Sequence, residues 1–283
     1  MIGRIKRLIS SHLAKKSTFL FQHKYKDLIE QIPKHLPIDF EVVSFSGSKQ
    51  FNDQLYSILS FFYNVGIPLK WTVYSDGTYT ENEKEIMTSV KNVVFKEVDT
   101  TGFDDNWNLM FDANPTLKKI AILSKLNIIR TTIFVDSDVL FFSSFLHYIE
   151  GLKDHNWYLE DESPNYFDTD LIQNIELIKH PLNFGMLILN ATHNWQFVLE
   201  YLTNKLTNGT LSYWSDQTAL HLFANQPGSN FYPLPKEYFV VNGSDSFKLG
   251  HDFNYNSIAV RHFVSPIRHK MWQYSWKKVL GVS

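Results

Sequence analysis

Short apolar runs alternate with stretches of helical periodicity through the first half of the chain. The pattern predicts strands at 40–45, 69–74, 93–98 and 133–135, and helices at 54–62, 81–90 and 117–126. Strands that alternate with helices are typical of α/β domains built on a parallel sheet. The run 133–135 is apolar throughout, which suits a strand in the buried middle of that sheet. We therefore expect an α/β three-layer sandwich around a central, mostly parallel sheet.

The second half of the chain has a weaker pattern. Strands are expected at 157–159 and 186–189, and a helix at 195–206. No internal repeat and no low-complexity linker divides the chain. We therefore expect one large domain over residues 37–283, preceded by a basic extension over residues 1–36.

The N-terminal extension combines basic and apolar residues. No acidic residue precedes Asp27, whereas seven Lys or Arg residues do. Ile2, Ile5, Ile9 and Leu13 recur among them at near-helical spacing. Such a helix either packs on the domain or lies on an anionic membrane surface, and the sequence leaves both options open.

The C-terminal stretch 271–280 places Trp272, Trp276 and Leu280 four residues apart, beside two lysines. This spacing predicts a helix whose apolar stripe packs on the domain or, together with the N-terminus, contacts a membrane. No apolar run reaches the roughly 18 residues that a membrane span needs. We expect a cytoplasmic location, with peripheral contact at the inner membrane surface as an open alternative.

Composition narrows the classes of function. Apolar residues make up 44% of the 283 residues and charged residues 20%, as in a globular protein with a substantial core. The net charge of −2 and the lack of a basic recognition helix argue against a nucleic-acid binder. The chain has no Cys, which excludes disulfides, thiolate nucleophiles and Cys-based metal sites. Aromatic residues reach 16%, and such rings also stack on sugars and bases.

Two carboxylates follow the strand 133–135 directly. Asp136 and Asp138 flank Ser137, so in an extended chain both carboxylates lie on the same side. Ligands of open α/β sheets bind beyond the carboxyl ends of the strands, where this pair lies. Paired carboxylate oxygens at that place suit Mg²⁺ or Mn²⁺ shared with phosphate oxygens. The alternative is that the two aspartates only cap the turn after the strand.

Four segments of the chain resemble, in order, the motifs of one enzyme family. They are Thr116–Ile120 with Asp136-Ser137-Asp138, the run 182–190 (Leu-Asn-Phe-Gly-Met-Leu-Ile-Leu-Asn), Ser215-Asp216-Gln217, and His262-Phe263 followed by Arg268 and Trp272. They resemble the basic helix and Asp-x-Asp motif, the Asn-Ser-Gly strand, the Asp-Gln motif and the His-Phe…Lys…Trp segment of GT-A glycosyltransferases. The chain is most similar to glycosyltransferase family 8, the group of glycogenin and of bacterial lipopolysaccharide galactosyl- and glucosyltransferases. The resemblance covers roughly residues 40–272 and implies a Rossmann-like GT-A catalytic domain over 37–283.

The chain departs from the family pattern at four positions. Phe184 stands where the family has a small residue, and Ser265 stands where it has Gly. Arg268 replaces the family's Lys, and Trp272 lies two residues later than the pattern expects. The resemblance therefore implies binding of a donor diphosphate more firmly than it implies the identity of the sugar.

The resemblance implies a role for each matching residue. Asp136, Asp138 and His262 are expected to bind Mn²⁺ (or Mg²⁺) together with donor phosphate oxygens. Arg268 is expected to grip the diphosphate, and Lys119, or Lys118 one position earlier, to neutralise it. The other candidates surround the donor: Asn183 and Gly185 at the sugar, Asp216 and Gln217 as catalytic candidates near the anomeric carbon, Phe45 and Ser46 at the base, and Asp76 at the nucleoside.

The activity that the resemblance implies is transfer of a hexose from a nucleotide-diphosphate sugar, a UDP-sugar by analogy, to a glycan, lipid-linked or other acceptor with retention of configuration. Retention can use a covalent intermediate on a carboxylate such as Asp216, or same-face attack guided by the leaving diphosphate. Two alternatives stay open. A haloacid-dehalogenase-type phosphatase also has Asp-x-Asp after an apolar strand, although that motif normally opens the domain. A nucleotide-sugar-binding homologue without turnover is the second.

Overall fold

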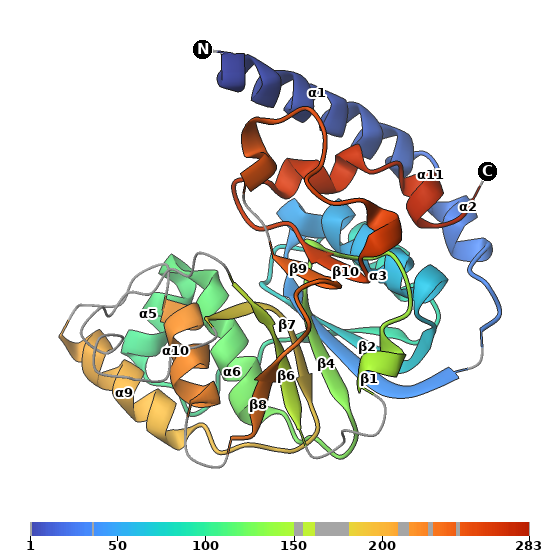
Figure 1. Cartoon of the computed structure of the whole chain (residues 1–283). Helices are drawn as coiled ribbons and strands as arrows, with labels where there is room; N and C mark the ends of the chain where they lie inside the picture. Colours follow the sequence, from blue (N-terminus) through green and yellow to red (C-terminus); the bar gives the residue numbers. More distant parts are fainter. Residues whose placement is uncertain are drawn as a thin grey trace.

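A seven-stranded sheet forms the centre of the protein (Figure 1). The structure is a computed structural model, and it describes residues 2–35, 37–149, 155–161, 181–208, 215–225, 229–241 and 244–282. The strand order is β3-β2-β1-β4-β7-β6-β8. These strands are β1 (Pro37–Ser46), β2 (Ile67–Ser75), β3 (Val93–Glu97), β4 (Thr132–Asp136), β6 (Asn156–Glu160), β7 (Leu182–Leu189) and β8 (Phe231–Pro233).

Most neighbours in this sheet run parallel, as predicted. β3, β2, β1 and β4 are parallel to one another, and β6 is parallel to β8. Only β7 is antiparallel to both its neighbours, β4 and β6, among the strands described. The predicted α/β fold with a mostly parallel central sheet is therefore confirmed.

Helices cover both faces of the sheet and complete the three layers (Figure 1). Alternate side chains of β4 explain why: Ile133 and Val135 join one apolar core, whereas Phe134 joins the other. One face carries α5 (Asp105–Ala113), α6 (Lys118–Lys125), α9 (Gln196–Thr207) and α10 (Ser215–Ala224). The other carries α3 (Phe51–Asn64), α4 (Glu81–Thr88), α7 (Leu146–Ile149) and the two ends of the chain.

A small second sheet joins the C-terminal part of the chain to the end of β4. It consists of β5 (Val139–Phe141), β10 (Val260–His262) and β9 (Phe239–Val241), in the order β5-β10-β9. β10 runs antiparallel to β5 and parallel to β9. Short 3₁₀ turns connect several of the elements, among them η1 (Ser48–Gln50), η2 (Pro115–Leu117), η3 (Ser244–Phe247) and η4 (Tyr255–Ser257).

The two ends of the chain pack on each other. The N-terminal residues form α1 (Ile2–Gln22) and α2 (Tyr25–Glu30), and α1 lies along η5 (Arg268–Gln273) and near α11 (Trp276–Val279) (Figure 1). The Phe21 ring is fully buried, 5.2 Å from the ring of Trp272 and 6.1 Å from that of Trp276. The division into an extension (1–36) and a domain (37–283) stays a prediction.

The prediction of a single helix over 271–280 is wrong. The chain is a 3₁₀ helix to Gln273, becomes extended at Tyr274, and resumes as α11. Tertiary contacts of Tyr274 explain the break, because its ring stacks on His251 at 3.5 Å and its hydroxyl donates to the Phe253 carbonyl at 2.8 Å. Trp272 and Trp276 are therefore buried core residues. None of the described helices is long and apolar enough to cross a membrane.

Candidate active site

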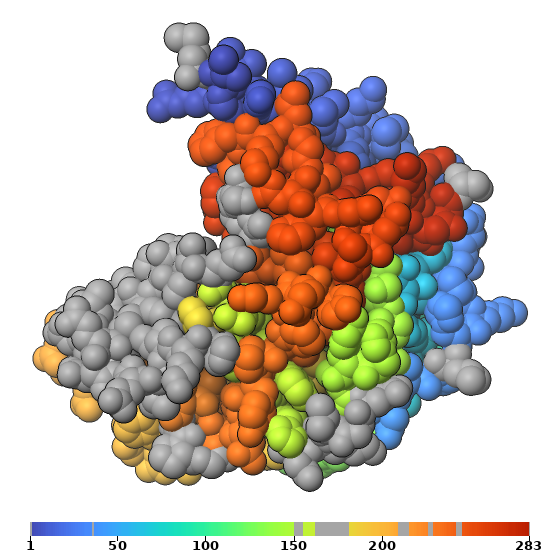
Figure 2. All heavy atoms as spheres, in the orientation of Figure 1, coloured from blue at the N-terminus to red at the C-terminus, as the bar shows by residue number. Residues whose placement is uncertain are grey.

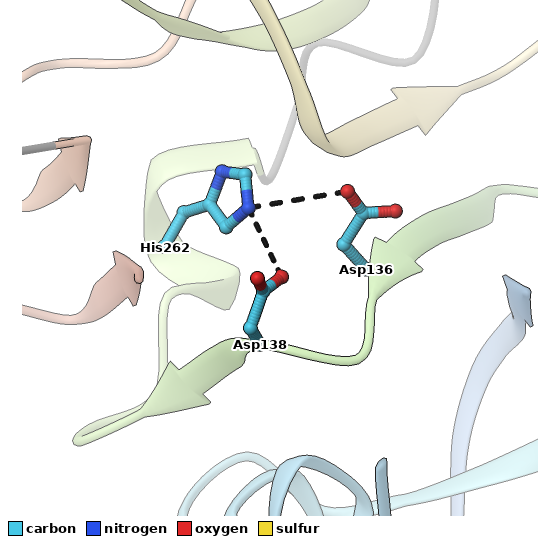
Figure 3. A group of neighbouring side chains, drawn as sticks. All are labelled: Asp136, Asp138 and His262. Atoms are coloured by element: carbon cyan, nitrogen blue, oxygen red, sulfur yellow. Dashed lines mark hydrogen bonds and ion pairs between the residues drawn. The ribbon is translucent and has the colours of Figure 1, made fainter. Parts of the chain in front are cut away.

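Asp136, Asp138 and His262 converge at the carboxyl end of β4 (Figure 3). The chain turns at Ser137 instead of staying extended, yet both carboxylates point toward the imidazole (Figure 3). Strand pairing positions the histidine: His262 lies opposite Val139 in the β5–β10 ladder, next to Asp138. The backbone N–H after His262 also donates to the Asp138 carbonyl at 2.8 Å.

The distances in this cluster suit a shared cation. Nε2 of His262 lies 3.1 Å from an oxygen of Asp138 and 3.9 Å from one of Asp136. One candidate ligand atom from each residue lies within 4.8 Å of the other two. Two carboxylates and one imidazole form a donor set that suits Mn²⁺ and related divalent ions.

Asn183 fixes the orientation of the histidine ring. Its Oδ1 accepts from the Gly185 N–H at 2.8 Å and lies 2.7 Å from Nδ1 of His262, while its Nδ2 donates to Asp161 at 2.9 Å. Because an amide oxygen only accepts, this network assigns the proton to Nδ1 of His262. A neutral ring with its proton on Nδ1 would present the Nε2 lone pair to a cation bound between the two carboxylates, as a metal ligand does. The residues present therefore fit a divalent cation.

The ring of His262 lies directly over the backbone of β7. A Cβ atom added to Gly185 would lie 2.1 Å from Nδ1 of His262, far inside contact distance. Glycine is therefore required here for the close approach of β7 to β10, in addition to any contact with a sugar.

Two cationic side chains flank the cluster. Arg268 donates through Nε to Asp138 at 2.7 Å, and its Nη2 lies 2.5 Å from the same carboxylate. Nζ of Lys119 lies 2.7 and 2.8 Å from the two oxygens of Asp136 and 3.9 Å from Asp216. Lys118 instead reaches the Asp76 carbonyl at 3.5 Å. Of the two candidate lysines, Lys119 is the one at the carboxylates.

Burial and charge act against each other at these groups. Burial alone would raise the pKa of Asp138, but the charges of Arg268 and His262 hold it below its usual range. Burial likewise disfavours the charged form of Lys119, yet Asp136 and Asp216 raise its pKa above the ordinary value. Burial raises the pKa of Asp216, and Lys119 opposes that shift. Lys119 and Asp138 therefore keep their charges although both are buried.

One cavity of about 390 Å³ collects most of the predicted residues. Lys119, Asp136, Asp138, Asn183, Asp216, Gln217, His262 and Arg268 all line it. Its other lining residues, Thr116, Phe184, Val264 and Ser265, were not predicted as site residues. Phe184 contributes a buried ring 4.8 Å from Nζ of Lys119 and 5.4 Å from the ring of Phe134. The sequence signal that could have identified Phe184 as a lining residue is its position between the predicted site residues Asn183 and Gly185.

Four predicted residues lie outside that cavity lining. One is Gly185, under the His262 ring, and the other three are the candidates for the base and the nucleoside. Phe45 is buried and pairs with Asp136 in the β1–β4 ladder. The Ser46 hydroxyl is buried between Gln54 and Tyr79, 2.8 Å from each. Asp76 accepts from the backbone and hydroxyl of Thr78 in its own turn. Their contact with a nucleoside stays a prediction.

The candidate site is identified by the side chains that line its cavity and not by the volume of that cavity. A larger cavity, about 800 Å³, lies between α5 and α9 and is lined by none of the predicted residues. Within the described ranges, the cluster of Asp136, Asp138 and His262 is the one group of such side chains placed to hold a metal ion.

Comparison with solved structures identifies the fold class of the chain. No protein-family model matches the chain, and no curated protein matches it in sequence. Several solved structures, however, are similar to this chain in fold. Galactosyltransferase LgtC, determined with donor and acceptor sugar analogues, is 14% identical over 85% of this chain and 95% of its own, with a TM-score of 0.57. Mouse xyloside xylosyltransferase 1 is 12% identical over 81% and 99%, with a TM-score of 0.53. Streptococcus pneumoniae GlyE is 13% identical over 86% and 63%, with a TM-score of 0.53. The chain therefore has the fold of GT-A glycosyltransferases.

Proposed function

We propose that this protein is a metal-dependent glycosyltransferase that transfers a hexose from a nucleotide-diphosphate sugar, with UDP-sugars as the expected donors, to a glycan or lipid-linked acceptor. One observation carries the proposal. In a chain with the GT-A fold, three metal-ligand side chains and two cations, Lys119 and Arg268, meet in one cavity at the carboxyl end of a central strand. A sugar diphosphate needs both kinds of partner, because its leaving group is doubly negative.

Asp136, Asp138 and His262 would hold Mn²⁺ or Mg²⁺. When bound there, the ion would supply positive charge to the leaving diphosphate. Asn183 holds the histidine in the tautomer that leaves Nε2 free for that role.

The remaining residues bind and orient the donor. Arg268 and Lys119 offer donors to phosphate oxygens, and Arg268 can do so with two parallel N–H groups. In transfer, the bond between the anomeric carbon and the diphosphate oxygen breaks, and a bond to the acceptor oxygen forms. The acceptor proton leaves with the diphosphate. We propose that Asp216 and Gln217 face the anomeric carbon and that configuration is retained.

The haloacid-dehalogenase-type alternative is not favoured. Its first aspartate is a nucleophile at the opening of the domain, whereas Asp136 ends the fourth strand in the chain and forms an ion pair with Lys119. The similar solved structures are glycosyltransferases. The second alternative, a nucleotide-sugar-binding homologue, would bind the donor without hydrolysing or transferring it, so an assay of UDP release distinguishes it from an enzyme.

Thermal unfolding with UDP, GDP or no nucleotide, each with Mn²⁺, Mg²⁺ or EDTA, tests donor and metal together. Ligand at about 100 times its Kd stabilises the native state by about 2.7 kcal/mol, which is readily measured as a rise in Tm. We expect the rise with UDP and Mn²⁺ and its loss in EDTA. No rise under any condition would overturn the proposed donor class.

Asp136→Asn tests the metal site by activity. We expect a loss of UDP-sugar turnover of about 10³-fold, because the change removes a charged ligand but little volume. UDP release from each UDP-sugar in the presence of Mn²⁺ measures it. Asp39→Asn, at an aspartate whose side chain is 83% exposed on the surface, is the matched control and should keep full activity. Full activity in Asp136→Asn would remove the metal role.

A further inference from the structure

Helix α1 carries its apolar side on the outside of the molecule. The residues it buries are few and mostly small: Ser10, Ala14 and Phe21. By contrast, Leu8 and Ile2 are each 71% exposed. A helix that packs on a domain normally turns its apolar face inward, so this orientation is the reverse of the usual one.

The exposed apolar residues form a continuous stripe. Ile2, Ile5, Ile9 and Leu13 follow one another at intervals of three or four residues, so they share one side of the helix. The outward-facing apolar set also includes Leu8, Phe19 and Leu20. Figure 2 shows α1 as a blue ridge at the rim of the molecule, bordered by the orange-red C-terminal part.

The stripe continues onto the neighbouring C-terminal segments. A groove of about 450 Å³ runs between α1 and the C-terminal part, lined by Leu13, Leu20 and Leu249 together with Lys16 and Lys277. The half-exposed ring of Phe247 packs against Gly3 near the start of α1. Apolar side chains and lysines therefore lie side by side over this face.

The charge of α1 is of one sign. Arg4, Lys6, Lys15 and Lys16 are exposed on it, and no acidic residue precedes Asp27. An apolar stripe flanked by cations is the pattern of helices that lie in the interface of an anionic bilayer, where apolar side chains enter the acyl boundary and cations contact lipid phosphates.

We infer that the outer face of α1 docks the protein on an anionic lipid bilayer. A second copy of the chain is the competing occupant of this face. It is disfavoured because two copies facing each other would oppose two sets of positive charges with no acidic partner on either helix. Trp272 and Trp276 line the groove but are buried, so the exposed apolar side chains of the docking face come chiefly from α1, with Lys277 of α11 at its edge.

The docked face lies beside the donor site. A cavity of about 530 Å³ opens beside the contact of α1 with η5 and is lined by Lys15, Thr18, Asp53 and Arg268. Arg268 also lines the catalytic cavity. If the proposed glycosyl transfer holds, a lipid-linked acceptor could reach the site from the same surface. The docking itself does not depend on that activity.

Sedimentation of the full chain with vesicles tests the inference. We would use phosphatidylcholine alone and phosphatidylcholine with about 30% phosphatidylglycerol, at about 50 and 500 mM salt, chosen because the Debye length shortens across that range. We expect binding to the anionic vesicles, little binding to the neutral ones, and weaker binding at high salt.

A matched pair of variants identifies the face. Leu8→Glu places a carboxylate on the stripe, and Leu109→Glu does the same on α5, where Leu109 is 68% exposed. We expect Leu8→Glu to lower vesicle partitioning at least about tenfold and Leu109→Glu to leave it unchanged. Lys6→Gln with Lys16→Gln should weaken binding to anionic vesicles only, and it keeps the apolar stripe intact.

Circular dichroism and Tm would show that each variant stays folded, since all four positions are exposed. Absence of binding by the wild-type chain, or equal loss in Leu8→Glu and Leu109→Glu, would overturn the inference. A wild-type dimer in light scattering that becomes monomeric in Leu8→Glu, without vesicle binding, would assign the face to a second copy instead.

Discussion

Nδ1 of His262 lies 2.7 Å from Oδ1 of Asn183, and this contact decides which ring nitrogen faces the two aspartates. The same oxygen accepts from the N–H of Gly185, so its position is fixed by β7 itself. A residue of the central sheet thereby orients a residue of the small second sheet. The geometry of the candidate metal site therefore depends on the packing of these two sheets.

Removal of this contact should weaken metal binding. In Asn183→Ala, His262 loses the acceptor that selects its tautomer. We expect metal affinity to fall about 10–100-fold, the usual effect of removing the hydrogen-bond partner of a metal-binding histidine. Calorimetric titration with Mn²⁺ measures the change. Asn204→Ala, an exposed position on α9, should bind Mn²⁺ like the wild type. Unchanged affinity in Asn183→Ala would mean that the tautomer is set by another group.

A methyl group at Gly185 should displace the histidine. The added Cβ would lie 2.1 Å from Nδ1 of His262, so the ring or β7 must move. We expect Gly185→Ala to cost about 1–3 kcal/mol of unfolding free energy and to abolish the Mn²⁺-dependent rise in Tm. Gly250→Ala is the control, because no atom lies within 4 Å of its added Cβ. Normal Mn²⁺ binding by a stable Gly185→Ala protein would contradict this account.

Phe184 should restrict the donor sugar. Its ring lines the candidate site cavity and contacts Lys119, in the position where the family that the sequence resembles has a small residue. We expect Phe184→Ser to admit bulkier donor sugars, seen as a lower KM for them, and to lose about 3–5 kcal/mol of stability through the cavity it leaves. A panel of UDP-sugars compared with Phe197→Ser, at an exposed ring on α9, measures both effects. An unaltered donor preference would place the sugar elsewhere.

Asp53 should make stability depend on pH. Burial raises its pKa to about 6, although the hydrogen bond from Trp272 lowers it. Because this folded value exceeds the unfolded value of about 3.9, the folded chain binds the extra proton, and unfolding free energy falls as pH rises between the two values. Asp53→Asn keeps an acceptor for Trp272. We expect its stability relative to wild type to increase by about 2 kcal/mol between pH 4 and pH 7 in urea unfolding. A difference that does not change with pH would contradict the shift.

The first half of the fold could be predicted because its apolar pattern is local. The runs at 40–45, 69–74, 93–98 and 133–135 correspond to the parallel strands β1, β2, β3 and β4. Helix α5 was not predicted, although Asp104 caps it and the rings of Trp107 and Phe111 lie one turn apart on it. The antiparallel direction of β7 has no local signal, because it depends on how distant strands pair.

The predicted site illustrates the same limit. The Asp-x-Asp pair after an apolar strand could be found from local sequence, but His262 and Arg268 were expected only through a family resemblance. Their approach depends on the β5–β10 register, which a single sequence does not specify. The break at Tyr274 was missed for the same reason, since its contacts with His251 and Phe253 come from a distant loop.

The packing of Phe21 against Trp272 and Trp276 has a consequence for biosynthesis. The ribosome makes Phe21 about 250 residues before its packing partners, which is roughly 13–50 s at the usual elongation rates of about 5–20 residues per second. During that interval Phe21 has no native neighbour among the C-terminal rings. His262 and Arg268 belong to the same late-made segment, so the nascent polypeptide cannot assemble the site before that segment has been synthesised.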